Sequence, residues 1–132
     1  ALKLISMCLV HDLPEARTGD LNYVQKNYVA SDEAKAVRDT IQDLPFGPTM
    51  AQLIEEFRAG ETRESLLARD ADQLAFILDL KALSDIGHSP PQKWLPTVLQ
   101  RLKTDTGKLM AGKIMETEWD EWWLKNYVDR PV

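Results

Sequence analysis

The chain has 132 residues, of which 44% are hydrophobic and 28% charged, and its formal net charge is −5 at pH 7. This composition predicts one soluble globular domain, and no apolar run approaches the ~18 residues that a membrane span needs. The negative charge argues against binding a nucleic-acid polymer, which takes many Lys and Arg contacts to phosphates. A small phosphorylated substrate stays possible, because a bound metal can supply positive charge locally. The single cysteine, Cys8, rules out an internal disulfide and fits the cytoplasm.

Hydrophobic residues at spacings of three and four predict helices along almost the whole chain. The first helix is expected over residues 1–16, and Thr18-Gly19-Asp20 ends it. Its buried face is expected to carry four residues, namely Leu2, Ile5, Leu9 and Leu13. Residues 21–30 are predicted to form a connector with a short helical turn.

Two helices with local start signals follow the connector. Ser31 is expected to cap a helix over residues 32–43, whose first turn is acidic. Thr49 and Gln52 are expected to form a capping box for a helix over residues 50–59.

The second half of the chain continues the helical pattern. Gly60 and Gly87 are expected to end the helices that precede them. Four further helices are predicted, over residues 62–86, 91–102, 106–115 and 117–127. With short loops between mostly antiparallel helices, the predicted fold class is an all-α helical bundle.

His11 and Asp12 stand side by side after an apolar run, and Glu15 follows three residues later. On a helix, Glu15 lies one turn after the pair and on the same face. An imidazole nitrogen and a carboxylate oxygen suit Mn, Co, Fe, Ni or Zn better than Ca. Glu15 is then placed to orient or deprotonate a water molecule bound to that metal.

A second acidic pair, Asp70 and Asp72, lies about sixty residues later on the long predicted helix. Asp72 lies between Ala71 and the apolar run of residues 74–76, so it is expected to point inward and to approach a metal from that helix. Asp70 is expected to face solvent or to support the ligands from outside. The alternative is that neither region binds metal, since His-Asp pairs arise by chance and Asp-x-Asp on a helix is commonly a solvated face.

The sequence LVHDLPEARTGD at residues 9–20 resembles the central motif of the HD-domain metal-dependent phosphohydrolases. It is most similar to the branch of cytosolic 5′-deoxynucleotidases and their oxetanocin-biosynthesis relatives. ARDADQL at residues 68–74 resembles the last motif of that family. The resemblance spans residues 1–86. It implies an HD-domain helical bundle, a divalent metal cation (Co, Mn, Mg, Ni, Fe or Zn) and hydrolysis of phosphate esters.

The resemblance also implies roles for five residues of this chain. It implies that His11, Asp12 and Asp72 are the metal ligands. Glu15 would position the attacking water or shuttle its proton, and Asp20 would contact the sugar of a nucleotide at the pocket wall.

One expected part of the family's site is missing from the sequence as given. The family's first metal-binding His and its phosphate-binding Arg are expected upstream of position 11, where this chain has neither. His88 is no substitute, because it lies about 24 Å from Asp72 along a continuous helix. We therefore expect residues 1–132 to be a single HD domain that lacks its N-terminal helix, with a decayed, non-catalytic member as the alternative.

Together these features predict a cytoplasmic homodimer that removes the 5′-phosphate from deoxynucleoside monophosphates. One alternative is an HD phosphohydrolase of another nucleotide or phosphomonoester. Another is a non-catalytic helical protein that binds a partner. Three tryptophans are expected to pack the last helix onto the bundle or to form an interface, namely Trp119, Trp122 and Trp123.

Overall fold

The structure is a computed structural model that describes residues 1–118 and 120–128, with the backbone only at positions 122, 125 and 126. The described residues form α-helices and one 3-10 helix, with no strand among them, so the all-α prediction is confirmed. The chain divides into two compact units, residues 1–68 and 69–132, each of which is described by itself. None of the described helices has the length and apolar character to cross a membrane.

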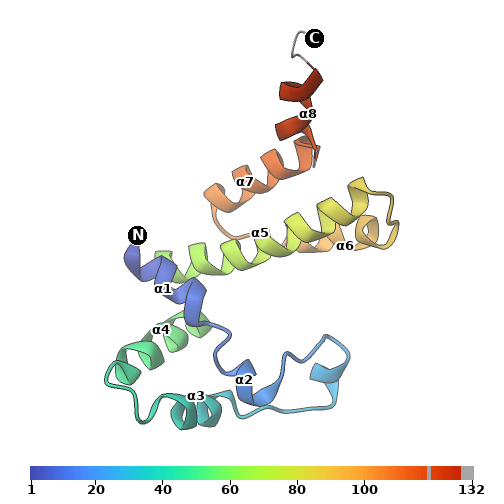
Figure 1. The fold of residues 1–132 in the computed structure, drawn as a ribbon. Coiled ribbons are helices and arrows are strands. Elements are labelled where there is room, and N and C mark those ends of the chain that lie inside the picture. Colours follow the sequence, from blue (N-terminus) through green and yellow to red (C-terminus); the bar gives the residue numbers. More distant parts are fainter. Residues whose placement is uncertain (119, 129–132) are drawn as a thin grey trace. The chain divides into compact units, whose positions relative to one another are not determined.

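The first unit is a small helical assembly around α4 (Figure 1). Its elements are α1 (Leu2–Val10), α2 (Glu15–Thr18), η1 (Gln25–Asn27), α3 (Glu33–Ile41), α4 (Gly47–Ala59) and the start of α5 (Arg63–Asp85). α4 packs against both α1 and α3, and α2 packs against α3. The buried cluster between these helices is small and consists of Val37, Ile41 and Ile54.

Pro14 divides the first predicted helix in two. Proline has no backbone N–H, so residue 14 cannot donate the helical hydrogen bond to the carbonyl of Val10. That carbonyl accepts from the backbone N–H of Leu13 instead, at 3.1 Å. Residues 11–14 therefore form a turn, and α2 begins at Glu15. The prediction of one helix over residues 1–16 is wrong beyond Val10.

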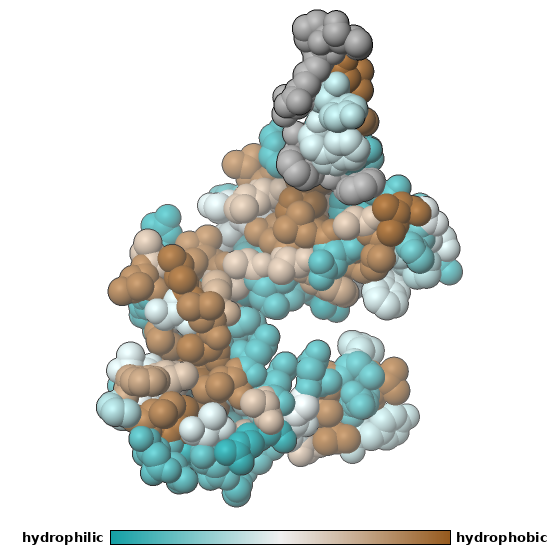
Figure 2. Space-filling model, viewed as in Figure 1, coloured by the Kyte–Doolittle hydropathy of each residue, from teal (hydrophilic) through white to brown (hydrophobic). Residues whose placement is uncertain are grey.

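The buried face of α1 also differs from the prediction. Met7 is fully buried, while three of the residues predicted to be buried are 52–80% exposed, namely Leu2, Ile5 and Leu9. Figure 2 shows this hydrophobic surface over α1. Almost every position of α1 is apolar, so spacing alone does not select one face. Lys3 contributes to the choice, because its ammonium pairs with Glu56 of α4 at 2.7 Å.

The start of α3 is capped one residue later than predicted. Oδ1 of Asp32 accepts a hydrogen bond from the backbone N–H of Lys35 at 2.8 Å. Asp32, rather than Ser31, is therefore the N-cap. Both residue types suit this position, and the local sequence does not decide between neighbours.

α4 begins at Gly47, before the capping box predicted for it. Pro48 occupies the first turn, where a missing N–H costs nothing. Thr49 and Gln52 consequently lie inside the helix, and the predicted box is wrong. The predicted end is confirmed, since Gly60 is the C-cap with φ 65° and ψ 30°, a left-handed conformation that favours glycine.

The second unit is built on the rest of α5 with α6 (Pro90–Leu99), α7 (Asp105–Glu116) and α8 (Glu121–Val128). The predicted limits of α5 and α7 are confirmed to within one residue. The buried cluster of this unit is larger and contains Leu74, Ile77, Leu80, Leu95, Val98, Leu102 and Ala111. Of the predicted tryptophan group, Trp119 and the side chain of Trp122 lie outside the described residues, and Trp123 is 39% exposed.

Candidate metal centre

His11 is held in one orientation at the end of α1. Its backbone N–H donates to the carbonyl of Met7 at 3.0 Å and closes the helix. Its ring lies against Phe57 of α4, with 4.5 Å between ring centroids. Nδ1 lies 3.0 Å from the carbonyl oxygen of Cys8, and since a carbonyl only accepts, Nδ1 carries the proton and donates. The other ring nitrogen, Nε2, is the one that faces Asp12.

Asp12 places a carboxylate oxygen beside that nitrogen. Its Oδ2 lies 3.2 Å from Nε2 of His11. The side chain of Asp12 is 62% exposed, whereas that of His11 is 14% exposed. Two electron-rich atoms at this separation repel each other unless a positive charge lies with them, either a proton on Nε2 or a metal ion bound to both. The pair therefore fits two ligands of a divalent cation.

The carboxyl of Glu15 lies close enough to His11 and Asp12 for both to affect its pKa. Its backbone N–H donates to the carbonyl of Asp12 at 2.9 Å, which keeps it next to the turn. Partial burial raises the pKa of the Glu15 carboxyl, and the nearby Asp12 and Asp20 raise it further. Lys26 and His11 act in the opposite direction. A raised pKa makes Glu15 a stronger proton acceptor than an ordinary carboxylate.

Gly19 turns the chain so that Asp20 lies near Glu15. It has φ 77° and ψ 154°, a combination that is essentially restricted to glycine. Its N–H donates to the carbonyl of Glu15 at 2.8 Å. Four of the five predicted site residues thus lie in the first unit, namely His11, Asp12, Glu15 and Asp20.

The predictions for Asp70 and Asp72 are reversed in the structure. Asp72 is exposed, and its Oδ2 accepts from Nε2 of the adjacent Gln73 at 3.0 Å. Asp70 is only 2% exposed. The prediction that Asp72 points inward and Asp70 outward is wrong, because the apolar neighbours of Asp72 did not indicate which side of α5 would be covered.

Asp70 has a structural role that the sequence did not reveal. Its Oδ1 accepts from the backbone N–H of Lys103 at 2.9 Å, and its Oδ2 accepts from the N–H and hydroxyl of Thr104 at 2.7 and 2.6 Å. Thr104 is the N-cap of α7, so Asp70 joins α5 to the start of α7. A side chain at Gly107 would overlap the Asp70 carboxylate.

The ligand set is incomplete within the first unit. In the part of the chain that the structure describes, no three His, Cys, Asp or Glu side chains are grouped so that they could hold a metal ion. His11 and Asp12 supply two ligands. Asp72 belongs to the second unit, and its role as a further ligand stays a prediction.

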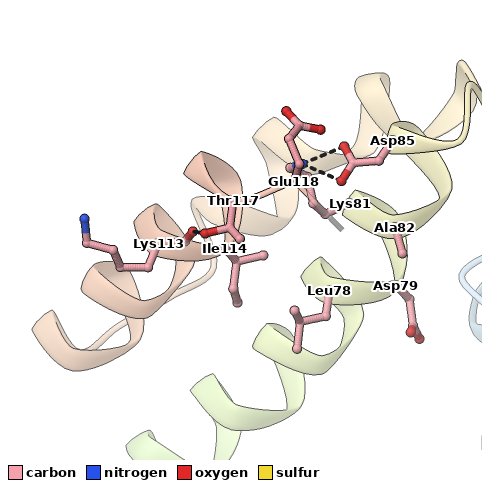
Figure 3. Close-up of a pocket in the computed structure, with 9 residues that line it drawn as sticks. All are labelled: Leu78, Asp79, Lys81, Ala82, Asp85, Lys113, Ile114, Thr117 and Glu118. Atoms are coloured by element: carbon pink, nitrogen blue, oxygen red, sulfur yellow. Dashed lines mark hydrogen bonds and ion pairs between the residues drawn. The ribbon is translucent and has the colours of Figure 1, made fainter. Parts of the chain in front are cut away.

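A surface pocket in the second unit contains none of the predicted site residues. It lies between α5 and α7 and has a volume of about 540 Å³ (Figure 3). Lys81 lies on its wall and bonds both carboxylate oxygens of Asp85 at 2.6 Å. This charge pair is internal to α5, and it gives the pocket no group with evident chemistry.

Most of the chain matches a known family. The model of the HD domain matches residues 1–114, which include the His11–Asp12 pair, Glu15, Asp20 and Asp72. The chain belongs to the HD-domain family. HD domains as a class bind divalent metals and are metal-dependent phosphohydrolases, which agrees with the ligand chemistry of the first unit. No curated protein and no solved structure matches the chain.

Proposed function

We propose that this HD-domain chain is a phosphomonoesterase that removes the 5′-phosphate from deoxynucleoside monophosphates. The observation that carries the proposal is the 3.2 Å approach of Asp12 Oδ2 to Nε2 of His11, with Glu15 beside the pair. The family supports metal-dependent phosphohydrolase chemistry in general. The choice of substrate rests on Gly19-Asp20, which resembles the nucleotidase branch.

In this proposal, each site residue of the first unit has its own role in the hydrolysis. His11 and Asp12 hold the divalent cation, with Asp72 proposed as a further ligand. When bound, the cation polarises a phosphoryl oxygen and lowers the pKa of nearby water. Glu15 accepts a proton from the attacking water, whose oxygen bonds to phosphorus as the ester P–O bond breaks. Glu15 then returns that proton to the leaving nucleoside oxygen, and Asp20 accepts a hydrogen bond from the sugar hydroxyl.

Phosphate release from a panel of substrates tests this proposal. The panel contains the deoxynucleoside 5′-monophosphates, their ribose forms and the triphosphates, each with Co²⁺, Mn²⁺ or Mg²⁺. We expect release from the deoxynucleoside monophosphates by the wild type and none by Asp12→Ala. The variant Lys93→Gln, at an exposed position of α6, serves as the matched control and retains activity. Release that Asp12→Ala does not lose would contradict the proposal, as would activity on triphosphates only.

A second candidate function has one observation in its favour. The exposed apolar side chains of α1 at positions 2, 5 and 9 form a stripe of the kind found at protein interfaces. In an enzyme, such a stripe suits the proposed homodimer; in a non-catalytic protein, it suits a different partner. Phosphate release separates the two functions, and Leu9→Asp tests whether the stripe is an interface. We expect this variant to change the oligomeric state of an active enzyme, whereas a non-catalytic protein shows no phosphate release in either form.

A further inference from the structure

We propose that Gln73 is a positioning residue that orients the Asp72 carboxylate for metal binding. This inference rests on the proposed function, in which Asp72 is a further ligand of the divalent cation. Nε2 of Gln73 donates a hydrogen bond to Oδ2 of Asp72 at 3.0 Å. Carboxylates that bind metals are commonly held by such hydrogen bonds from residues outside the ligand set, and loss of the donor typically weakens metal binding about 10–100-fold.

The hydrogen bond restricts a side chain that would otherwise move. Asp72 is exposed, and an exposed aspartate ordinarily samples several rotamers. Binding a cation would then cost the conformational entropy of that freedom, and the bond from Gln73 lowers this cost in advance. A carboxylate has about four lone-pair sites, so it can accept from the amide and still bind a cation. Because the amide is neutral, this bond orients the carboxylate without cancelling its charge.

The other end of the same amide lacks a hydrogen bond. Oε1 of Gln73 is buried, and no group in the described part of the chain donates to it. A buried carbonyl oxygen without a donor costs free energy, and such atoms are rare in folded proteins. A rotation of the amide by half a turn would bring Oε1 against Oδ2 of Asp72, and both atoms only accept. The bond to Asp72 therefore fixes the amide with its oxygen on the buried side.

Stability alone does not explain a glutamine at position 73. The side chain is half-buried on α5, next to Leu74 of the apolar cluster of the second unit. A leucine of similar size would leave no buried acceptor without a donor there. Local departures from the most stable choice of residue are typical of functional sites. The unsatisfied oxygen and the bond to the exposed Asp72 together indicate that Gln73 serves binding rather than folding.

Calorimetric titration of the full chain with Co²⁺, combined with urea denaturation of the same proteins, tests this inference. We expect Gln73→Leu to bind Co²⁺ about tenfold more weakly than the wild type. Because this variant loses the unsatisfied oxygen, its urea midpoint should equal or exceed that of the wild type. The matched control is Gln92→Leu, which removes an exposed glutamine from α6 and should leave the Co²⁺ affinity unchanged.

Several results would overturn the role of Gln73. One is equal Co²⁺ affinity of Gln73→Leu and the wild type, and another is a wild type that binds no Co²⁺. A loss of affinity that is matched by a fall in the urea midpoint would show a purely structural role. Undiminished Co²⁺ binding by Asp72→Ala would also contradict the inference, because Gln73 acts through Asp72.

Phosphate release by the same proteins separates failure of this inference from failure of the proposed function. If the wild type releases phosphate from deoxynucleoside monophosphates and Gln73→Leu keeps the full Co²⁺ affinity, the inference fails and the enzyme assignment stands. If the wild type releases no phosphate but Gln73→Leu still binds Co²⁺ more weakly, the proposed function fails and the role of Gln73 at the metal centre stands.

Discussion

The two units of the chain use buried and exposed polar groups in opposite ways. The second unit has the larger apolar cluster, and its buried carboxylate, Asp70, receives three hydrogen bonds from one loop. The first unit has a cluster of only three buried residues, and its carboxylates remain partly or largely open to solvent. Satisfied buried charge indicates a structural role, whereas the more exposed carboxylates of the first unit remain accessible to the proposed cation.

Asp70 and Asp72 sharpen this comparison, because they lie two residues apart on α5 and differ in burial. Asp70→Ala leaves three donors without their acceptor in a buried place, and we expect it to lower the free energy of unfolding by about 3 kcal/mol. Asp72→Ala removes an exposed side chain and should change that free energy by no more than about 0.5 kcal/mol. Urea denaturation of both variants measures the difference.

Metal binding should rank the same two variants in the opposite order, because the variant that loses little stability is expected to lose the metal. We expect Asp72→Ala to lose metal and activity, and folded Asp70→Ala, assayed well below its melting temperature, to retain metal. Equal stability losses in the two variants would contradict the structural part of the comparison. Retention of metal and turnover by Asp72→Ala would remove it from the proposed ligands.

Gly19 and Gly112 provide a test of backbone strain with effects of opposite sign. Gly19 has φ 77°, so Gly19→Ala forces an alanine into a strained conformation and should cost about 1–2 kcal/mol. Gly112 lies within α7, and an added Cβ meets nothing within 4 Å. Gly112→Ala should therefore stabilise the protein by about 0.5–1 kcal/mol. Thermal melts compare both with the wild type, and stabilisation by Gly19→Ala would show that the turn before Asp20 is not fixed as described.

Glu15→Gln is expected to have the smallest effect on the free energy of unfolding, and this effect depends on pH. The folded protein raises the pKa of Glu15 above its ordinary value of 4.5, so the charged carboxylate is disfavoured on folding. The contribution of Glu15 to stability is fully present below that ordinary pKa and is lost as pH rises through the folded pKa. In chelator-treated protein, Glu15→Gln should therefore gain stability relative to the wild type between pH 4 and pH 7. A stability difference that is constant over this range would contradict the raised pKa.

Local signals in the sequence predicted the helices whose ends are set locally. As expected, Gly60 ends α4 and Gly87 follows the end of α5. Both have a positive φ, a conformation that favours glycine. The exposed face of α1 could not be predicted, since its apolar residues surround the helix. The break at Pro14 was available in the sequence, because a proline inside a helical pattern removes a hydrogen bond.

The predicted site residues of the first unit are close in sequence, whereas the contacts that hold them and the neighbouring helices join distant positions. His11, Asp12, Glu15 and Asp20 follow one another within ten residues, and all four lie in the first unit. The contact of Phe57 with the His11 ring joins positions 46 residues apart and has no local signal. The hydrogen bonds from Thr104 to Asp70 join positions 34 residues apart and likewise have no local signal. In the turn after Asp20, the side chains of Asn22 and Gln25 each accept a hydrogen bond from the other's backbone N–H. This pair did carry a local signal, because a side-chain acceptor three residues before a polar partner is typical of such turns.

The metal content of the two histidine variants tests the central claim most directly. The chain has two histidines, and His88, which is exposed, is the matched control for His11. After incubation with Co²⁺ and dialysis, mass spectrometry of the metal should find about one cobalt per wild-type chain. We expect His11→Ala to lose this cobalt and His88→Ala to keep it. Retention by His11→Ala, or no cobalt in the wild type, would contradict a metal centre at the His11–Asp12 pair.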